Sequence, residues 1–144
     1  MTQRFQTRKM FLGTLVCLAT GALPLCAAIH ITKVQMGTGK TDNYEIVNPA
    51  TEFVPGTPAI YCVWRSEGLK IGASMRGVWI AEDVGKVAPP DHKIDEATVK
   101  ALVANEGYFS LSKPNNGFPV GKYRLEIYSG QELVRTVPFT VKAR

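Results

Sequence analysis

Few residues of this chain have the types and spacing that covalent catalysis requires. The sequence contains 2 histidines, His30 and His92, which lie far apart along the chain. A hydrolytic site pairs a histidine with a nucleophile, but no serine lies in a nucleophile-elbow motif and no Cys-x-x-Cys pair occurs. Residues 37–41, Gly-Thr-Gly-Lys-Thr, end like a phosphate-binding loop but lack its earlier glycine. The sequence therefore predicts a protein that is not an enzyme and uses no cofactor.

One set of side chains could bind a metal ion, and copper fits this set best. Removal of a leader before residue 28 or 29 would leave His30 near a new N-terminus, where amine and imidazole nitrogens can ligate Cu(II). The other candidate ligands are Met36, Met75 and His92. In the alternative interpretation, His30 is a strand residue and both methionines fill gaps in the core. A periplasmic copper carrier is thus the alternative function.

Acidic residues gather in residues 82–96, which also contain Pro89-Pro90. The acidic residues are Glu82, Asp83, Asp91, Asp95 and Glu96. Carboxylate oxygens can hold Ca²⁺, but the alternating Asp-x-Asp-x-Asp spacing is missing, and Lys86 and Lys93 dilute the charge. We therefore expect a solvated loop in this segment.

A further group of side chains has the composition of a protein-binding surface. Apolar and polar residues alternate along 121–133, so that Tyr123, Leu125 and Ile127 share one side of a strand. The opposite side carries Lys122, Arg124, Glu126 and Tyr128. Aromatic residues beside arginine are typical of binding hot spots, and Trp79 would add a second large aromatic. In the alternative interpretation, this hairpin is scaffold and the tryptophan packs inward.

The first 28 residues have the form of a secretory signal peptide. A basic start, an apolar middle and a run of small residues follow one another before Ala28. The basic residues are Arg4, Arg8 and Lys9. We expect cleavage after Ala28, which would leave 29–144 as one exported domain in the periplasm or outside the cell. Two alternatives stay open, an uncleaved apolar anchor and lipidation of Cys26.

Removal of this segment would leave the chain nearly neutral. It contains three of the 17 basic residues and none of the 12 acidic ones, so the net charge falls from +5 to about +2. No cluster of lysine and arginine is left, so the electrostatic footprint of a nucleic-acid-binding protein is missing. Cys62 is the single cysteine of 29–144 and has no partner for a disulfide, so we expect a small buried hydrophobic residue.

Alternation with a period of two predicts strands along most of 29–144. The expected strands are 29–36, 44–47, 59–64, 69–80, 108–112, 122–128 and 137–141. The inward side changes near Gly77, where we expect a β-bulge. Residues 98–103 suit either a helical turn or a strand, and Pro138 indicates an edge strand or a bulge. About seven or eight short strands with frequent turns indicate an all-β sandwich.

The last thirty or so residues resemble the closing hairpin of immunoglobulin-like domains, including fibronectin III-like domains of small exported bacterial proteins. The resemblance rests on Pro-x-Gly-x-Tyr at 119–123, followed by an alternating strand, a tight turn and a second strand. It implies that Tyr123 forms a tyrosine corner, in which the phenol bonds to nearby backbone. The chain differs from antibody domains because Cys62 has no partner for their disulfide. Trp64 or Trp79 would then fill the space in the core that the disulfide occupies in those domains. The resemblance implies a fold and no activity.

Together these features predict an exported binding or envelope-accessory protein. Its partner would be a protein or another envelope component, reached through a sheet face, a free edge strand or the loops. Membrane contact is expected only through an uncleaved anchor or a lipid on Cys26.

Overall fold

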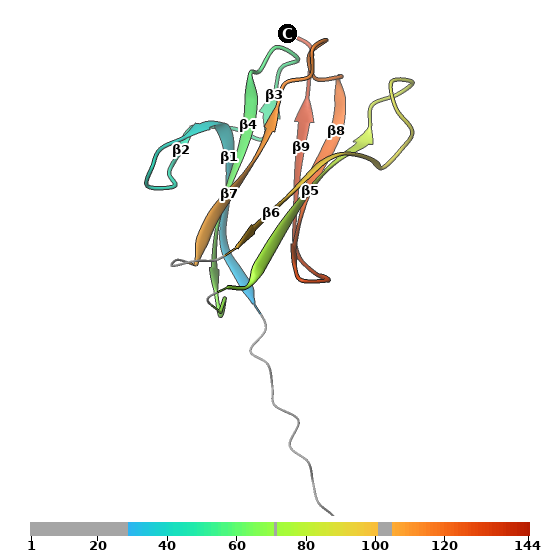
Figure 1. Cartoon of the computed structure of the whole chain (residues 1–144). Helices are drawn as coiled ribbons and strands as arrows, with labels where there is room; N and C mark the ends of the chain where they lie inside the picture. The colour runs from blue at the N-terminus through green and yellow to red at the C-terminus, as the bar shows by residue number, and fades with distance from the viewer. Residues whose placement is uncertain (1–28, 71, 101–104) are drawn as a thin grey trace, which may run out of the picture.

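The computed structural model describes residues 29–70, 72–100 and 105–144, which form two β-sheets (Figure 1). The strands are β1 (His30–Lys40), β2 (Ile46–Pro49), β3 (Glu52–Phe53), β4 (Ala59–Glu67), β5 (Ser74–Asp83), β6 (His92–Lys100), β7 (Glu106–Ser112), β8 (Gly121–Ser129) and β9 (Glu132–Val141). Within the described residues, no helix has the length and apolar character needed to cross a membrane.

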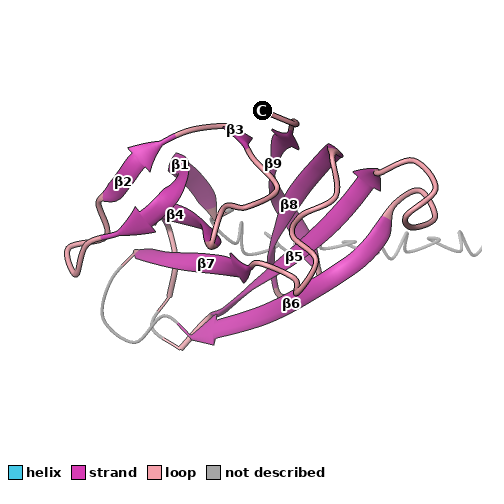
Figure 2. Ribbon diagram, turned by 90° about the horizontal axis from the view of Figure 1, so that it is seen from above, coloured by secondary structure: helices cyan, strands magenta, loops and turns pink. Residues whose placement is uncertain are grey.

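The two sheets form an immunoglobulin-like sandwich. The four-stranded sheet has the order β2-β1-β4-β7, and the five-stranded sheet has the order β3-β9-β8-β5-β6. All neighbouring strands are antiparallel except β3 and β9. Figure 2 shows β1, β2, β4 and β7 together on one side of the molecule and β5, β6, β8 and β9 on the other. The buried side chains of both sheets form one core cluster. The predicted all-β sandwich is therefore confirmed.

Alternation along the strands places one side of each sheet in the core. The inward residues of β4, β7 and β8 are Ile60, Cys62, Trp64, Phe109, Leu111, Tyr123, Leu125 and Ile127, all of which are buried. At about 25 cal/mol per Å² of apolar surface, each large side chain buried in this way contributes about 1.5–3 kcal/mol. The period of two thus specifies both the strands and the side of each that faces the core.

Aromatic rings fill the space between the sheets. Trp64 stacks on Phe109 with 6.2 Å between ring centroids. The ring centroid of Phe139 lies 5.1 Å from that of Tyr123 and 5.8 Å from that of Trp79. Both tryptophans are thus core residues, so the prediction that a tryptophan fills the core is confirmed.

Gly77 has a different role from the one predicted. A Cβ at this position would lie 2.6 Å from Cγ of Phe109, so the glycine lets that ring rest on the β5 backbone. The register of β5 shifts later, between Trp79 and Ile80 against β6 and between Ala81 and Asp83 against β8. The predicted bulge at Gly77 is therefore wrong, because close packing and not a change of register requires the glycine.

Two further segments differ from the sequence-based expectation. Residues 82–96 are not one loop, because β5 continues to Asp83 and β6 begins at His92. Most side chains of β6 are exposed, so the strand lacks the alternation by which strands are recognised and depends on pairing with β5. β1 continues to Lys40, beyond the end of the expected strand at Met36. Thr98–Lys100 belong to β6, whereas 101–104 and Ile71 lie outside the described residues.

Tyr123 forms the predicted tyrosine corner. Its hydroxyl donates a hydrogen bond to the carbonyl oxygen of Pro119 at 2.5 Å, while its ring is 2% exposed. Burial raises the pKa of this phenol from 10.0 to about 12. Pro138 lies where β9 has only β8 as a neighbour, because β3 pairs with Thr140 and Val141 alone, which confirms the predicted edge position.

We expect Tyr123→Phe to lower the free energy of unfolding by about 1–2 kcal/mol, because the Pro119 carbonyl loses its donor. Urea unfolding at pH 7 measures this. Tyr61→Phe is the control and should change stability by less than about 0.5 kcal/mol. Since the folded pKa of Tyr123 lies above the unfolded value, its contribution is complete below pH 10.0 and lost as the pH rises towards about 12. Equal effects of the two variants would contradict a tyrosine corner.

Candidate functional site

The four side chains predicted to form a binding surface lie together on the outer face of β8. Lys122 is exposed, and Arg124, Glu126 and Tyr128 are partly exposed. They alternate with the buried residues of the same strand, as the sequence predicts. The structure therefore brings these four residues to one surface, and their contacts decide what that surface can do.

Arg124 is surrounded by three carboxylates. Its guanidinium contacts Oε1 of Glu126 at 2.8 Å, Oδ1 of Asp91, and Oε2 of Glu82 at 3.8 Å. Asp91 reaches it from the end of the β5–β6 loop in a left-handed conformation with φ 57°, which aspartate tolerates better than most residues. Hydrogen bonds to Asp91 and then Glu126 raise the pKa of Arg124, so it stays charged at every accessible pH. Only 20% of its side chain is exposed.

The network continues across β5 and β6. The hydroxyl of Tyr128 donates to Oε2 of Glu126 at 2.6 Å, and this bond is the main cause that raises the pKa of Tyr128. Arg76 lies over the Tyr128 ring, 4.4 Å from the centroid, and contacts Glu96 at 3.6 Å. Burial alone would raise the pKa of Glu126, but hydrogen bonds from Tyr128 and Arg124 and the charge on Arg124 outweigh it and lower that pKa below 4.5.

This ionic network covers two aliphatic side chains on the outer face. Val78 and Ile80 point away from the core, opposite Glu126 and Arg124 on β8, yet are only 6% and 7% exposed. The charged residues therefore satisfy one another while their stems shield apolar surface. That arrangement explains the network as a structural cover for the sheet.

Trp79 does not belong to this surface, which corrects the prediction that it forms part of the binding patch. It shares the inward side of β5 with Met75 and Gly77, and it is 1% exposed. Because β5 lies between β8 and β6, its inward residues face the middle of the sandwich. The sequence places Trp79 at alternate spacing to Val78 and Ile80 but does not show which of the two sets faces inward.

The structure does not bring the proposed copper ligands together. Met36 and Met75 are buried in the core, at 3% and 0% exposure, on strands of different sheets. His30 begins β1 at the end of the sandwich where β4 leads to β5, whereas His92 begins β6 at the opposite end. Among the described residues, no three histidine, cysteine, aspartate or glutamate side chains are placed to hold a metal ion.

His92 lies instead at a cleft of about 310 Å³ whose walls are mostly apolar. The apolar lining includes Val84, Ala88, Ile94, Phe118 and the ring of Tyr123. Cys62 is 0% exposed, and burial raises the pKa of its thiol to about 12, so it is a neutral core residue, as the sequence predicts.

A second surface, on the outer face of the four-stranded sheet, was not found by sequence reasoning. Tyr108 of β7 lies 6.4 Å from Tyr61 of β4 and 6.1 Å from Tyr44 of the β1–β2 turn, measured between ring centroids. The ammonium of Lys40 lies 4.3 Å from the centroid of the Tyr108 ring. We call these four residues, together with Arg65, the tyrosine face.

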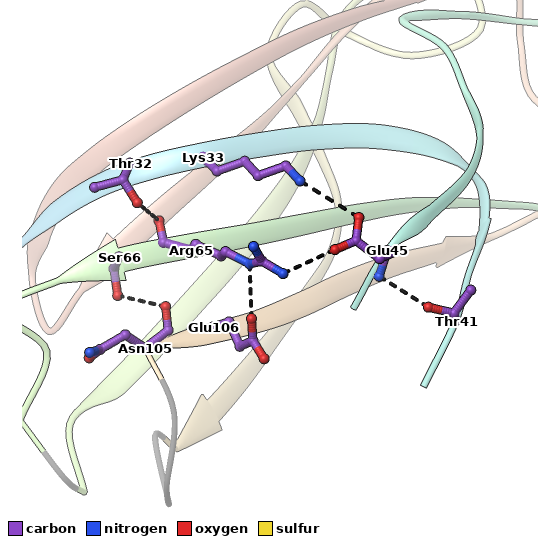
Figure 3. Close-up of polar contacts among 8 residues, drawn as sticks. All are labelled: Thr32, Lys33, Thr41, Glu45, Arg65, Ser66, Asn105 and Glu106. Carbon is purple, nitrogen blue, oxygen red and sulfur yellow. Dashed lines mark hydrogen bonds and ion pairs between the residues drawn. The ribbon is translucent and has the colours of Figure 1, made fainter. Parts of the chain in front are cut away.

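The tip of the β1–β2 hairpin folds back over this sheet. Figure 3 shows Glu45 between Lys33 of β1 and Arg65 of β4, at 3.7 Å and 3.1 Å. Arg65 also contacts Glu106 of β7 at 2.9 Å, so a chain of ion pairs crosses three neighbouring strands. Tyr44 in this tip has a φ of 55°, which is rare for a bulky residue and often marks a functional site.

Part of the tyrosine face could have been found in the sequence. Tyr61 alternates with the core residues Ile60 and Cys62, and Tyr108 precedes the inward Phe109, so both must point outward. The contribution of Tyr44 could not have been found in the sequence, because the path of a hairpin tip across three strands depends on contacts between residues that are distant in sequence.

Comparison with known proteins supports the fold. An immunoglobulin-like protein from Pseudomonas aeruginosa aligns with a TM-score of 0.54 and 18% sequence identity, over 82% of this chain and 99% of that chain. No protein-family model matches the chain, and no curated protein matches it. At this identity the likeness shows the immunoglobulin-like fold alone.

We expect Arg124→Met to lower the free energy of unfolding by about 1–2 kcal/mol at pH 7, because three carboxylates lose their shared cation. The pKa of Glu126 is lowered in the folded protein, so the wild-type advantage is present above pH 4.5 and lost as the pH falls through the folded value. Chemical unfolding at pH 7 and pH 3 measures both effects.

The matched control is Lys142→Met, which removes the ion pair with Glu52 between side chains that are 62% and 57% exposed. Such an exposed pair should contribute less than about 0.5 kcal/mol. If Arg124→Met had no larger effect than this control, the ionic network would not be a structural cover.

Proposed function

We propose that this chain is an exported, non-enzymatic binding module that contacts a protein partner through the tyrosine face. The observation that carries the proposal is the gathering of Tyr44, Tyr61 and Tyr108 with Lys40 on one outer sheet face. Tyrosine is enriched at binding hot spots, because its side chain combines a large apolar surface with a hydrogen-bonding hydroxyl.

The side chains of the tyrosine face already contact one another within the chain. Lys40 lies over the ring of Tyr108, and this ring also contacts both other tyrosines. Side chains that already hold one another lose less conformational freedom on binding, so more of the contact energy contributes to affinity. Tyr108 is nevertheless 37% exposed, which leaves surface for a partner.

The outer face of β8 supports this function less well. The side chains of Arg124 and Glu126 are only 20% and 15% exposed, and each already makes charge-assisted hydrogen bonds within the chain. A partner would have to compete with these bonds, whereas the hydroxyls of the tyrosine face make none among the described residues. We therefore assign binding to the four-stranded sheet and structural support to the network.

Export is the second part of the proposal. It rests on the basic, apolar and small regions of residues 1–28, whose order is that of a secretory signal peptide. The exported domain would function in the periplasm or outside the cell, where its partner is a protein of the envelope. Cys62 suits that destination because a buried, neutral thiol resists oxidation.

Site-specific photo-crosslinking in the producing cell tests the proposal. A benzophenone amino acid replaces Tyr108 in one variant and Tyr128, on the opposite sheet, in a matched variant, and export is followed by intact mass. We expect processed protein from both variants and a discrete protein adduct from the Tyr108 position alone. Adducts from the Tyr128 position alone, or equal adducts from both, would overturn the assignment of the face.

A further inference from the structure

The outer edge of β6 is a second surface that could bind a partner, through backbone groups that no neighbouring strand in the described residues pairs. β6 ends the five-stranded sheet, and within the described part of the chain it pairs only with β5 (Figure 2). It is nine residues long and contains no proline. An edge strand of this length presents unpaired backbone groups that can pair with another extended segment.

The core side of β6 is only partly covered, although Ile94 and Val99 pack against the core. Asp95, Ala97 and Val99 lie opposite the inward residues Trp79, Gly77 and Met75 of β5, so they point to the core side of the sheet. Yet Asp95 and Ala97 are exposed, and Val99 is only partly buried. These three residues therefore offer exposed surface to the side chains of an added strand.

The carboxylate of Asp95 occupies a backbone donor on this edge. Its Oδ1 accepts a hydrogen bond from the backbone N–H of Glu96 at 2.8 Å. Residues along an antiparallel strand alternate between its two neighbours, and the carbonyl of Ser74 in β5 accepts a hydrogen bond from Gly130 on the β8 side. The next residue, Met75, therefore bonds to β6 through its partner Val99. By the same alternation, Glu96, Thr98 and Lys100 direct their backbone groups away from β5. Asp95 thus satisfies one of the outward donors, which is a means of keeping an edge from pairing indiscriminately.

We propose that the β6 edge binds an extended polypeptide segment as an added antiparallel strand, with a basic residue next to Asp95 and apolar residues next to Ala97 and Val99. A lysine or arginine beside Asp95 would draw its carboxylate away from the N–H of Glu96 and free that donor for the new strand. Asp95 therefore selects for a positive charge at one position of the partner.

Charge argues against a second copy of this chain as the occupant. Antiparallel addition of β6 to β6 in the register that pairs all nine residues would place Glu96 opposite itself. Like charges directly opposite each other destabilise a strand pair. The β6 edge is separate from the tyrosine face, which lies on the other sheet.

Two synthetic probes test the proposal. The arginine probe is an acetylated peptide with valine at the positions next to Ala97 and Val99, arginine next to Asp95 and threonine at the positions between them. The glutamate probe has the same sequence with glutamate in place of the arginine. Amide hydrogen exchange, followed by NMR on the purified full chain, should show protection of Glu96, Thr98 and Lys100 by the arginine probe. The glutamate probe should bind about fivefold more weakly, and Asp95→Lys should reverse the preference.

Thr98→Pro provides the control, because it removes an outward donor and leaves pairing with β5 intact. We expect it to abolish binding of the arginine probe while the thermal unfolding temperature stays close to wild type. Ala97→Pro, by contrast, should destabilise the sheet. The proposal would be overturned if the arginine probe bound Thr98→Pro as well as wild type, if it protected amides outside β6, or if it did not bind at millimolar concentration. It would also be overturned if sedimentation showed that the chain pairs with itself and that Thr98→Pro removes this pairing.

Discussion

The contact between Phe109 of β7 and Gly77 of β5 joins the two sheets at the centre of the sandwich. The ring lies so close to the β5 backbone that a Cβ on Gly77 would meet it at 2.6 Å. On the β4 side the same ring stacks on Trp64, for which Gly107 makes room in the neighbouring strand. These contacts determine which side of β4, β5 and β7 faces inward, because a slip of one residue would turn every side chain to the other face.

Once the inward sides are determined, the two outer faces differ in chemistry. On the five-stranded sheet, Arg124 and its carboxylates neutralise one another above Val78 and Ile80. On the four-stranded sheet, the folded hairpin tip assembles tyrosine rings around Lys40. The first arrangement is already satisfied within the chain, whereas the second leaves aromatic surface open to a partner. This difference is the physical basis for assigning binding to one face and support to the other.

The correct predictions from the sequence rest on local signals. Alternation in 121–129 identified β8 and its inward residues, and Pro-x-Gly-x-Tyr identified the tyrosine corner of Tyr123. The errors came from contacts between distant residues. Edge strand β6 has no buried side to create alternation, and the orientation of Trp79 depends on which side of β5 meets Phe139. Tyr44 joins the candidate site only because the hairpin tip folds across the sheet.

If the tyrosine face is the binding surface that we propose, a partner covers it in the cell while the outer face of β8 stays exposed. Hydroxyl-radical footprinting with mass spectrometry compares the oxidation of Tyr108 and Tyr128 in intact cells with that in the purified protein. We expect Tyr108 to be oxidised severalfold more slowly in cells and Tyr128 to be oxidised at the same rate in both. Slower oxidation of Tyr128 with no change at Tyr108 would contradict the proposal.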